Sequence, residues 1–297
     1  VILETDGEVV GYTRVIPCYF LLDGKRIRAG YFADYFTHAD HRGSGVQISR
    51  HLLRKPDILR IGAPVARTIR MWRKLSGRPA QISQIERCVL MLKPSEFLKR
   101  KGLPTPLGWP VDWIWRLKLL RACKSLRGHD ELALSDAQAL PGDDELAALV
   151  AEFSQDFYAI AERDGDYFRW RFSESGFDYR YIWLRNQGSL VGYAVYRDGE
   201  VNGRKTLLIV EIMAIADKQR YYAAMLDWIC QYGLANDFAD VQTLKSGCAD
   251  FLQVMQRLGA VLKPEKEYLM AYICSDEPYA TEMYQEKIGR ASCRERV

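Results

Sequence analysis

A repeat with a spacing of about 181 residues constrains the fold of this chain more than any other feature of its sequence. Three segments recur in the same order, each at nearly the same distance from its counterpart. They are residues 9–12 (VVGY) and 190–193 (LVGY), 74–77 (KLSG) and 257–260 (RLGA), and 90–91 and 269–270 (LM in both). Short matches arise by chance, but matches that keep their order and spacing indicate a duplicated domain.

The apolar runs and turn residues predict the same series of elements in both repeats. In the first repeat we expect strands at residues 1–4, 9–20, 27–37, 58–61 and 87–92, with helices at 46–54 and 65–75. In the second we expect strands at 179–184, 190–196, 206–215, 241–244 and 268–274, with helices at 220–232 and 249–258. Strands followed by strand–helix alternation predict an α/β fold, in which helices cover the faces of a mixed sheet.

The repeat predicts two tandem domains, residues 1–101 and 130–275, joined by a linker at residues 102–129. Pro104, Pro106 and Pro110 mark the boundary, and we expect a linker helix to start after Pro110. The linker from Gly108 onward carries three tryptophans beside several basic residues, a composition that also occurs in helices lying on membrane surfaces. We expect it instead to dock between the domains with its aromatic side chains buried.

Both ends of the chain look foreign or incomplete. Residues 276–297 form a tail, and the last eleven residues, KIGRASCRERV, match a translated short-read sequencing adapter. We therefore leave residues 287–297 out of the fold prediction. The chain opens on Val1, inside an expected strand, so we expect the first domain to be truncated at its N-terminus.

The charge of the chain is unevenly distributed. Residues 1–101 carry a net charge of +10, residues 102–286 carry −9, and residues 287–297 carry +3. A basic half suits an anionic ligand, and halves of opposite charge also attract each other. No run of Lys and Arg is long enough to favour nucleic acid, so we expect no nucleic-acid partner.

Cysteine use and hydropathy bear on the location of the protein. Six cysteines precede the tail, with no CxxC pair among them, at positions 18, 88, 123, 230, 248 and 274. This usage is typical of a reducing compartment and predicts a cytoplasmic protein. No stretch of eighteen apolar residues is present, so we expect no membrane span.

Residues 32–47, FADYFTHADHRGSGVQ, form the segment that most clearly predicts chemistry. A strand enters a glycine-containing turn, and the turn opens a helix. Such a turn directs backbone N–H groups outward at a helix N-terminus, where the helix dipole adds partial positive charge. Gly43 and Gly45 allow close approach of the backbone to a phosphate or pyrophosphate, and Arg42 adds a charged donor.

This segment resembles the GNAT superfamily of coenzyme A-dependent N-acyltransferases, in which Arg/Gln-x-x-Gly-x-Gly/Ala opens the central helix. Arg42 and Gly45 match that motif, whereas Gln47 is larger than the small residue found there. The resemblance implies tandem acyltransferase domains with acetyl-CoA as co-substrate. It places the pyrophosphate on backbone groups of Arg42, Gly43, Ser44, Gly45, Val46 and Gln47, and the pantetheine amides beside Phe36 and Thr37.

The resemblance also nominates Asp34 as the catalytic residue, because the family sometimes places a carboxylate there, near the acceptor amine. Such a group removes a proton before the amine attacks the thioester. A strand-edge carboxylate without a catalytic role is the alternative. The family's tyrosine, which often protonates the departing thiolate, is missing: Val65, Thr68 and Trp72 stand at the positions of that motif.

The second repeat has no glycine at the corresponding turn, residues 216–220 (ADKQR). We interpret it as non-catalytic, with a role in acceptor recognition or as a scaffold. His38, His41 and His51 lie close to Asp34 in the sequence, but they span a strand, a turn and a helix, so we expect no metal site.

The favoured hypothesis is therefore an N-acyltransferase that moves an acetyl group from acetyl-CoA to a small-molecule amine. The alternative is a non-catalytic binding or regulatory protein built from two acyltransferase-like domains, which the missing tyrosine and Gln47 favour. We do not expect a membrane surface to be a partner. The sequence indicates neither the acceptor nor the oligomeric state.

Overall fold

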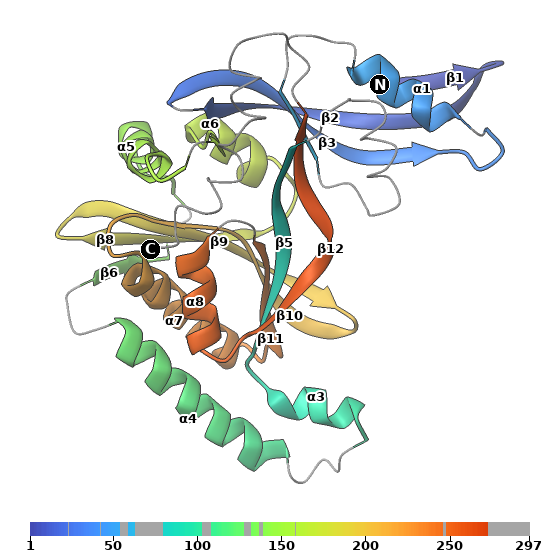
Figure 1. Ribbon diagram of the computed structural model, residues 1–297. Coiled ribbons are helices and arrows are strands. Elements are labelled where there is room, and N and C mark those ends of the chain that lie inside the picture. Colours follow the sequence, from blue (N-terminus) through green and yellow to red (C-terminus); the bar gives the residue numbers. More distant parts are fainter. Residues whose placement is uncertain are drawn as a thin grey trace. The chain divides into compact units, whose positions relative to one another are not determined.

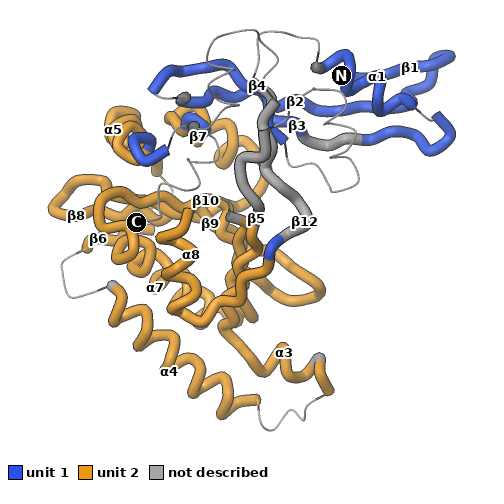
Figure 2. The backbone as a smooth tube through the Cα atoms, in the orientation of Figure 1, with its two compact units in different colours: residues 1–85, 154–162, 264–297 blue, residues 86–153, 163–263 orange. Residues whose placement is uncertain are grey.

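The computed structural model describes the chain except for residues 23, 42, 54–58, 63–79, 103–107, 128–131, 137–138, 158, 246–247 and 273–297. It confirms the predicted mixed α/β architecture with tandem repeats. The chain divides into two compact units, shown in Figure 2. Unit 1 holds residues 1–85, 154–162 and 264–297, and unit 2 holds residues 86–153 and 163–263.

In unit 1 the first three strands are antiparallel to one another, whereas the fourth pairs in parallel with the third. Its strands are, in hydrogen-bonded order, β1 (Ile2–Thr5), β2 (Glu8–Leu22), β3 (Lys25–Thr37), β4 (Leu59–Gly62) and part of β12 (Val261–Tyr272), with β7 (Ala159–Ala161) beside β2 (Figure 1). The β1–β2 turn uses Asp6 and Gly7, with φ of 54° and 81°, values that this residue pair tolerates. Helix α1 (Ser44–Leu53) follows β3.

Unit 2 contains most of the helices that the structure describes. Its strands are, in hydrogen-bonded order, part of β5 (Ala80–Met91), β11 (Asp240–Lys245), β10 (Arg204–Ala214), β9 (Ser189–Val201), β8 (Tyr179–Asn186) and β6 (Leu132–Ser135). Its helices are α3 (Pro94–Arg100), α4 (Gly108–Arg127), α5 (Asp143–Ser154), α6 (Gly165–Phe168) with a π-helical turn at Arg169–Ser173, α7 (Lys218–Ala235) and α8 (Ala249–Arg257). Figure 1 shows α7 and α8 together on one face of β8–β11, with α5 and α6 on the other.

The two repeats exchange their last strands. Strand β5 ends the first repeat, yet its residues 86–91 pair with β11 in unit 2. Strand β12 ends the second repeat, yet its residues 270–272 pair with β4 in unit 1. Each compact unit thus contains a strand from the other repeat. The domain boundaries inferred from the repeat stay a prediction, because the compact units and the sequence repeats divide the chain at different residues.

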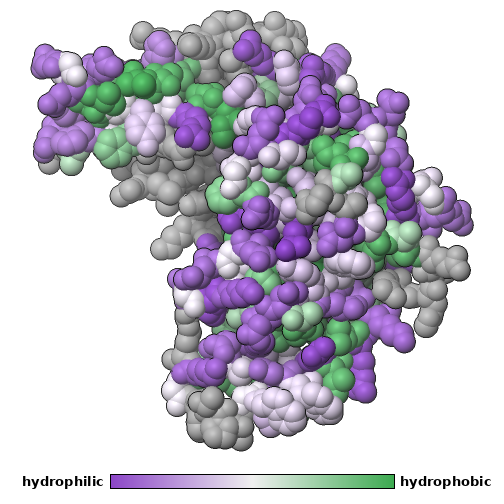
Figure 3. Space-filling model, turned by 180° about the vertical axis from the view of Figure 1, so that it is seen from behind, coloured by the Kyte–Doolittle hydropathy of each residue, from purple (hydrophilic) through white to green (hydrophobic). Residues whose placement is uncertain are grey.

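The central strands differ in how deeply they are buried. In unit 2, every residue of β9 from Leu190 to Tyr196 is buried, as expected for a strand covered on both faces. In unit 1, the face opposite α1 carries the neighbouring residues Ile2, Tyr12 and Phe36 on three adjacent strands. These side chains are 64%, 42% and 47% exposed, and hydrophobic residues gather over this part of unit 1 in Figure 3.

Helix α4 departs from its prediction in two respects. It begins at Gly108 rather than after Pro110, and Pro110 fits in the first turn because the N–H it lacks would have no helical partner there. The expectation that the helix buries its tryptophans is wrong for two of the three. Trp115 donates a hydrogen bond from Nε1 to the Met91 carbonyl (2.7 Å), but Trp109 and Trp113 are 77% and 55% exposed.

Candidate coenzyme A site

Strand β3 contains a β-bulge near the predicted coenzyme A site. Thr13 of β2 pairs with Tyr35, and the next residue, Arg14, pairs with Ala33. Asp34 is therefore an extra residue, that is, a β-bulge in β3. Bulges bend a strand and redirect side chains, and they are common next to active sites. The structure describes the backbone of Asp34 but not its side chain.

The end of β3 also has an open edge. On the β4 side, recorded pairing runs from Ala29–Leu59 to Phe32–Gly62. On the β2 side, pairing continues to Thr37, which lies opposite Gly11. Among the described residues, the last five positions of β3 thus have no strand partner on the β4 side. Phe36 and Thr37, the predicted pantetheine neighbours, lie on this edge.

The turn after β3 places its glycines at the start of α1. Gly43 has φ of 96°, a left-handed conformation that favours glycine, and a Cβ there would meet no atom within 4 Å. The first turn of α1 contains no acidic residue, so its partial positive charge is not offset locally. Arg42 lies outside the described residues.

Several N–H groups of this turn already have partners. The amides of His41 and Ser44 bond to carbonyls three residues earlier, and those of Val46 and Gln47 both bond to the Gly43 carbonyl, at 3.0–3.3 Å. Ser44 is buried, and its hydroxyl donates to the His41 carbonyl at 2.7 Å. For Gly43 and Gly45 the structure records no backbone N–H bond to another described residue. These two amides are the ones best placed to receive an anion.

The second repeat shows the same strand geometry with a different turn. Val210 is an extra residue in β10, since Ile209 and Glu211 face the consecutive residues Tyr196 and Val195. Recorded pairing of β10 with β11 ends at Leu208–Gln242, so this strand also has an open edge near its bulge. However, only residues 215–217 separate β10 from α7, whereas residues 38–43 separate β3 from α1.

Glu211 is a site residue that the sequence analysis missed. It lies three residues before the end of β10, as Asp34 lies three residues before the end of β3. Its carboxylate accepts hydrogen bonds from the hydroxyls of Tyr193 (2.6 Å) and Tyr167 (2.9 Å), and it forms an ion pair with Arg163. The predicted strand ended at residue 215, and counting back three residues from there gives Ile212, so this equivalence follows only from the observed end of β10 at Ala214.

The surroundings of Glu211 raise the pKa values of its partners. Burial raises the pKa of Tyr167 and of Tyr193, and the negative charge of Glu211 raises both further. Burial lowers the pKa of Arg163, but Glu211 more than reverses that effect, so the net pKa is raised. Both tyrosines remain neutral donors and Arg163 remains charged. The carboxylate is saturated with partners inside unit 2, as expected of a structural rather than a catalytic acid.

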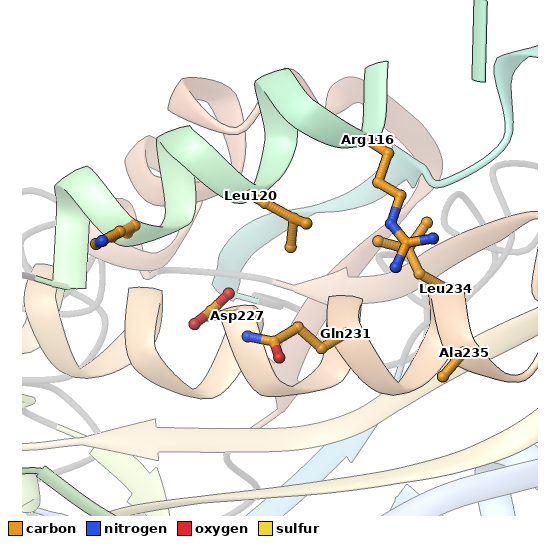
Figure 4. Close-up of a pocket in the computed structure, with 7 residues that line it drawn as sticks. Arg116, Leu120, Asp227, Gln231, Leu234 and Ala235 are labelled. Atoms are coloured by element: carbon orange, nitrogen blue, oxygen red, sulfur yellow. The ribbon is translucent and has the colours of Figure 1, made fainter. Parts of the chain in front are cut away.

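The structure places an open cavity of about 540 Å³ elsewhere in unit 2. Its lining comes from Arg116, Leu120 and Lys124 of α4 and from Asp227, Gln231, Leu234 and Ala235 of α7. Figure 4 shows Arg116 reaching from α4 toward Leu234 while Asp227 points from α7 toward α4. None of these residues belongs to the predicted coenzyme A site.

Comparison with solved structures identifies the fold. A conserved protein of unknown function from Enterococcus faecalis V583, described as a probable N-acyltransferase, matches with a TM-score of 0.61 at 15% identity over 91% of this chain and 61% of that one. A GCN5-related N-acetyltransferase (GNAT) from Anabaena variabilis matches with a TM-score of 0.61 at 11% identity over 92% and 62%. This chain has the GNAT fold.

Saccharomyces cerevisiae N-myristoyltransferase with bound myristoyl-CoA shares the arrangement as well, with a TM-score of 0.57 at 14% identity over 90% of this chain and 65% of that one. The chain thus spans less than two thirds of the length of these three proteins. No family model and no curated protein matches the sequence. The paired bulges and open strand edges of the two repeats are consistent with a GNAT fold present twice.

The described residues contain no group of three or more His, Cys, Asp or Glu side chains arranged to hold a metal ion. None of the helices that the structure describes is long and apolar enough to cross a membrane. Trp72, at the position of the family's proton-donating tyrosine, lies outside the described residues, as do Val65, Thr68 and the helix predicted at 65–75.

Proposed function

We propose that the protein is an N-acyltransferase that uses its first repeat to transfer an acetyl group from acetyl-CoA to an amine. One observation carries the proposal. In a chain with the GNAT fold, the bulged and open end of β3 leads directly into the Gly43-Ser44-Gly45 turn at the start of α1. The second repeat has the bulge and the open edge without such a turn.

The residues at the turn fit a diphosphate in three respects. The left-handed Gly43 leaves open space where another residue would place its Cβ. The amides of Gly43 and Gly45 are not engaged with any described residue. The start of α1 offers partial positive charge without a nearby carboxylate in its first turn. Arg42, in the same turn, supplies a further positive charge.

The proposed reaction is direct attack in a ternary complex. The amine nitrogen forms a bond to the thioester carbonyl carbon, the carbon–sulfur bond breaks, and coenzyme A leaves as a thiolate. Asp34, on the bulge, accepts the proton that the amine loses, directly or through a water molecule. Because Trp72 occupies the tyrosine position of the family motif, the thiolate takes its proton from water. Positioning of the two substrates supplies much of the rate.

Calorimetry with acetyl-CoA tests the site. We expect saturable binding to the intact chain and at least tenfold weaker binding to Arg42→Glu and Gly45→Trp. Lys218→Glu, at the turn of the second repeat, is the matched charge control and should bind as the unchanged protein does. Equal affinity of all four proteins for acetyl-CoA would show that the coenzyme does not bind at this turn. Competition with myristoyl-CoA would show whether the site accepts a longer acyl chain.

The second candidate is a binding or regulatory protein that holds an acyl-CoA without turnover. The absence of a tyrosine at Trp72 and the bulky Gln47 favour it. A thiol-release assay with a panel of amines separates the two functions. Acetyl-CoA binding that depends on Gly45, combined with no amine-dependent thiol release, would support the second candidate and exclude the first.

A further inference from the structure

Helix α4 presents an aromatic and aliphatic surface to solvent. Trp109, Trp113 and Ile114 are 77%, 55% and 61% exposed. Trp109 and Trp113 are four residues apart and are neighbours on one face of the helix, and Ile114 extends the exposed surface about 100° further round. Tryptophan is a large side chain that a soluble protein usually covers, and a cluster of this kind marks an interaction surface.

Basic side chains continue the solvent-exposed half of α4 toward its C-terminal end. Lys118, Arg121 and Lys124 are all exposed. The one acidic residue of the helix, Asp112, is directed away from this surface, since its carboxylate accepts hydrogen bonds from the backbone N–H and hydroxyl of Ser95 in α3. The exposed face is therefore apolar at its N-terminal end and uniformly positive at its C-terminal end.

The opposite face of α4 fixes the helix in unit 2. Leu119 and Cys123 are fully buried, and Trp115 is held by the hydrogen bond to Met91. The ring of Trp115 lies against Gly259, where an added Cβ would approach it to 3.0 Å. The outward tryptophans are thus presented by a helix that is already packed, so binding through them requires little ordering of the backbone.

We propose that the exposed face of α4 docks on an anionic lipid surface. Tryptophan side chains are favoured at the boundary between acyl chains and headgroups, because the ring is apolar and its N–H finds a polar partner there. Lys118, Arg121 and Lys124 would lie near the lipid phosphates, and basic residues on an amphipathic helix are attracted to anionic headgroups. Arg116 and Lys124 also line the open cavity beside α7, where Asp227 is the one acidic lining residue.

Charge favours lipid over a protein partner for this face. Every charged residue of α4 outside the Asp112–Ser95 contact is positive, and exposed tryptophans beside basic residues on a helix are typical of helices that lie on anionic membrane surfaces. This inference does not depend on acyl transfer, since none of its residues belongs to the coenzyme site.

Vesicle flotation of the full chain tests the inference. We expect binding to phosphatidylcholine vesicles that contain phosphatidylserine, much weaker binding to pure phosphatidylcholine, and loss of binding as salt rises. The double variant Trp109→Ala/Trp113→Ala and the triple variant Lys118→Glu/Arg121→Glu/Lys124→Glu should each lower the partition coefficient at least tenfold. Circular dichroism should show unchanged folding, because the five side chains are exposed.

Matched controls come from exposed residues elsewhere. Trp170→Ala removes a 45% exposed tryptophan outside α4, and Lys25→Glu/Arg28→Glu/Lys263→Glu makes the same charge change on β3 and β12. Both controls should bind vesicles within about twofold of the unchanged chain. The inference is wrong if the unchanged chain does not float with anionic vesicles at low salt. It is equally wrong if Trp109→Ala/Trp113→Ala only dissociates a dimer in sedimentation, which would assign the face to a second copy.

Discussion

The two strand-to-helix turns begin from similar geometry and end in different environments. Each follows a bulged strand with an open edge, and each strand carries a carboxylate three residues before its end. The first turn has six residues and a left-handed Gly43 in open space. The second has three residues, and its left-handed position, φ 53°, is Ala216. Shortening the turn removes the backbone groups that an anion would need, while the surrounding fold survives.

The carboxylates of Asp34 and Glu211, one on each bulged strand, also differ between the repeats. Glu211 is bound by two tyrosines and an arginine inside unit 2, and its side chain is only 9% exposed. Glu211 therefore stabilises unit 2, whereas the proposed function gives Asp34 a role in proton transfer. The predictions below test this contrast, from the largest expected effect to the smallest.

Neutralising the carboxylate of Glu211 should mainly lower stability, whereas neutralising that of Asp34 should mainly lower turnover. We expect Glu211→Gln to lower the free energy of unfolding by about 3 kcal/mol, because it leaves the charge of Arg163 without its partner. Asp34→Asn should lower it by less than about 0.5 kcal/mol and should reduce turnover. Urea unfolding and a thiol-release assay measure the two effects. A large stability loss in Asp34→Asn would contradict the proposed difference in role.

Tyr193 and Tyr12, which occupy equivalent positions in the two repeats, give a second pair of variants to compare. Tyr193 is fully buried and donates to Glu211, whereas Tyr12, at the same place in the first repeat, is 42% exposed. Removing a hydrogen bond to a charged group costs about 2 kcal/mol, so Tyr193→Phe should destabilise the protein by that amount. Tyr12→Phe should change stability by less than about 0.5 kcal/mol. Similar denaturation midpoints for both variants would count against the contrast.

Changes at the turns themselves should separate binding from stability. Gly45→Trp should weaken acetyl-CoA binding at least tenfold, which corresponds to about 1.4 kcal/mol. Ala216→Gly should leave binding unchanged and stabilise the fold by up to about 1 kcal/mol, since glycine adopts a left-handed conformation without strain. Calorimetry and thermal unfolding measure these effects. Loss of acetyl-CoA binding in Ala216→Gly would show that the second turn also takes part.

One surface ion pair in each unit provides the smallest test. Arg185 binds both carboxylate oxygens of Glu145 (2.5 and 2.8 Å), and Arg26 binds Glu162 at 2.7 Å. Because both pairs are partly exposed, we expect Arg185→Ala and Arg26→Ala each to cost only about 0.5 kcal/mol. Urea unfolding of the two single variants measures both effects. A loss of unfolding free energy several times larger for either variant would show that its ion pair is a major source of stability in that unit.

The Glu145–Arg185 pair also predicts a pH dependence. The hydrogen bond from Arg185 lowers the pKa of Glu145 in the folded protein. The pair therefore stabilises the fold above the pKa of an unfolded glutamate, about 4.3, and the contribution is lost as pH falls through the lower folded pKa. The difference in unfolding free energy between the unchanged chain and Arg185→Ala should shrink from pH 6 to pH 3. A difference that stays constant over this range would refute the assignment.

Much of the fold was predictable because it rests on local patterns. The apolar runs placed the strands of both repeats within a few residues of β2, β3, β9 and β10, and the glycine-containing turn marked the start of α1. Hydrogen bonds within a helix or a hairpin join residues near each other in the sequence, so composition and spacing are enough to predict them. The duplication was visible for a different reason: matching segments keep their order and a spacing of about 181 residues.

The sequence by itself determined the tandem α/β repeat and the position of the glycine turn. Only the tertiary structure decided that Glu211 is neutralised by residues 18, 44 and 48 positions away, that the last strands are exchanged, and that Trp109 and Trp113 face solvent. The physical reason is the range of the interactions. Side-chain partners and burial depend on which distant segments pack together, and no local pattern carries that information.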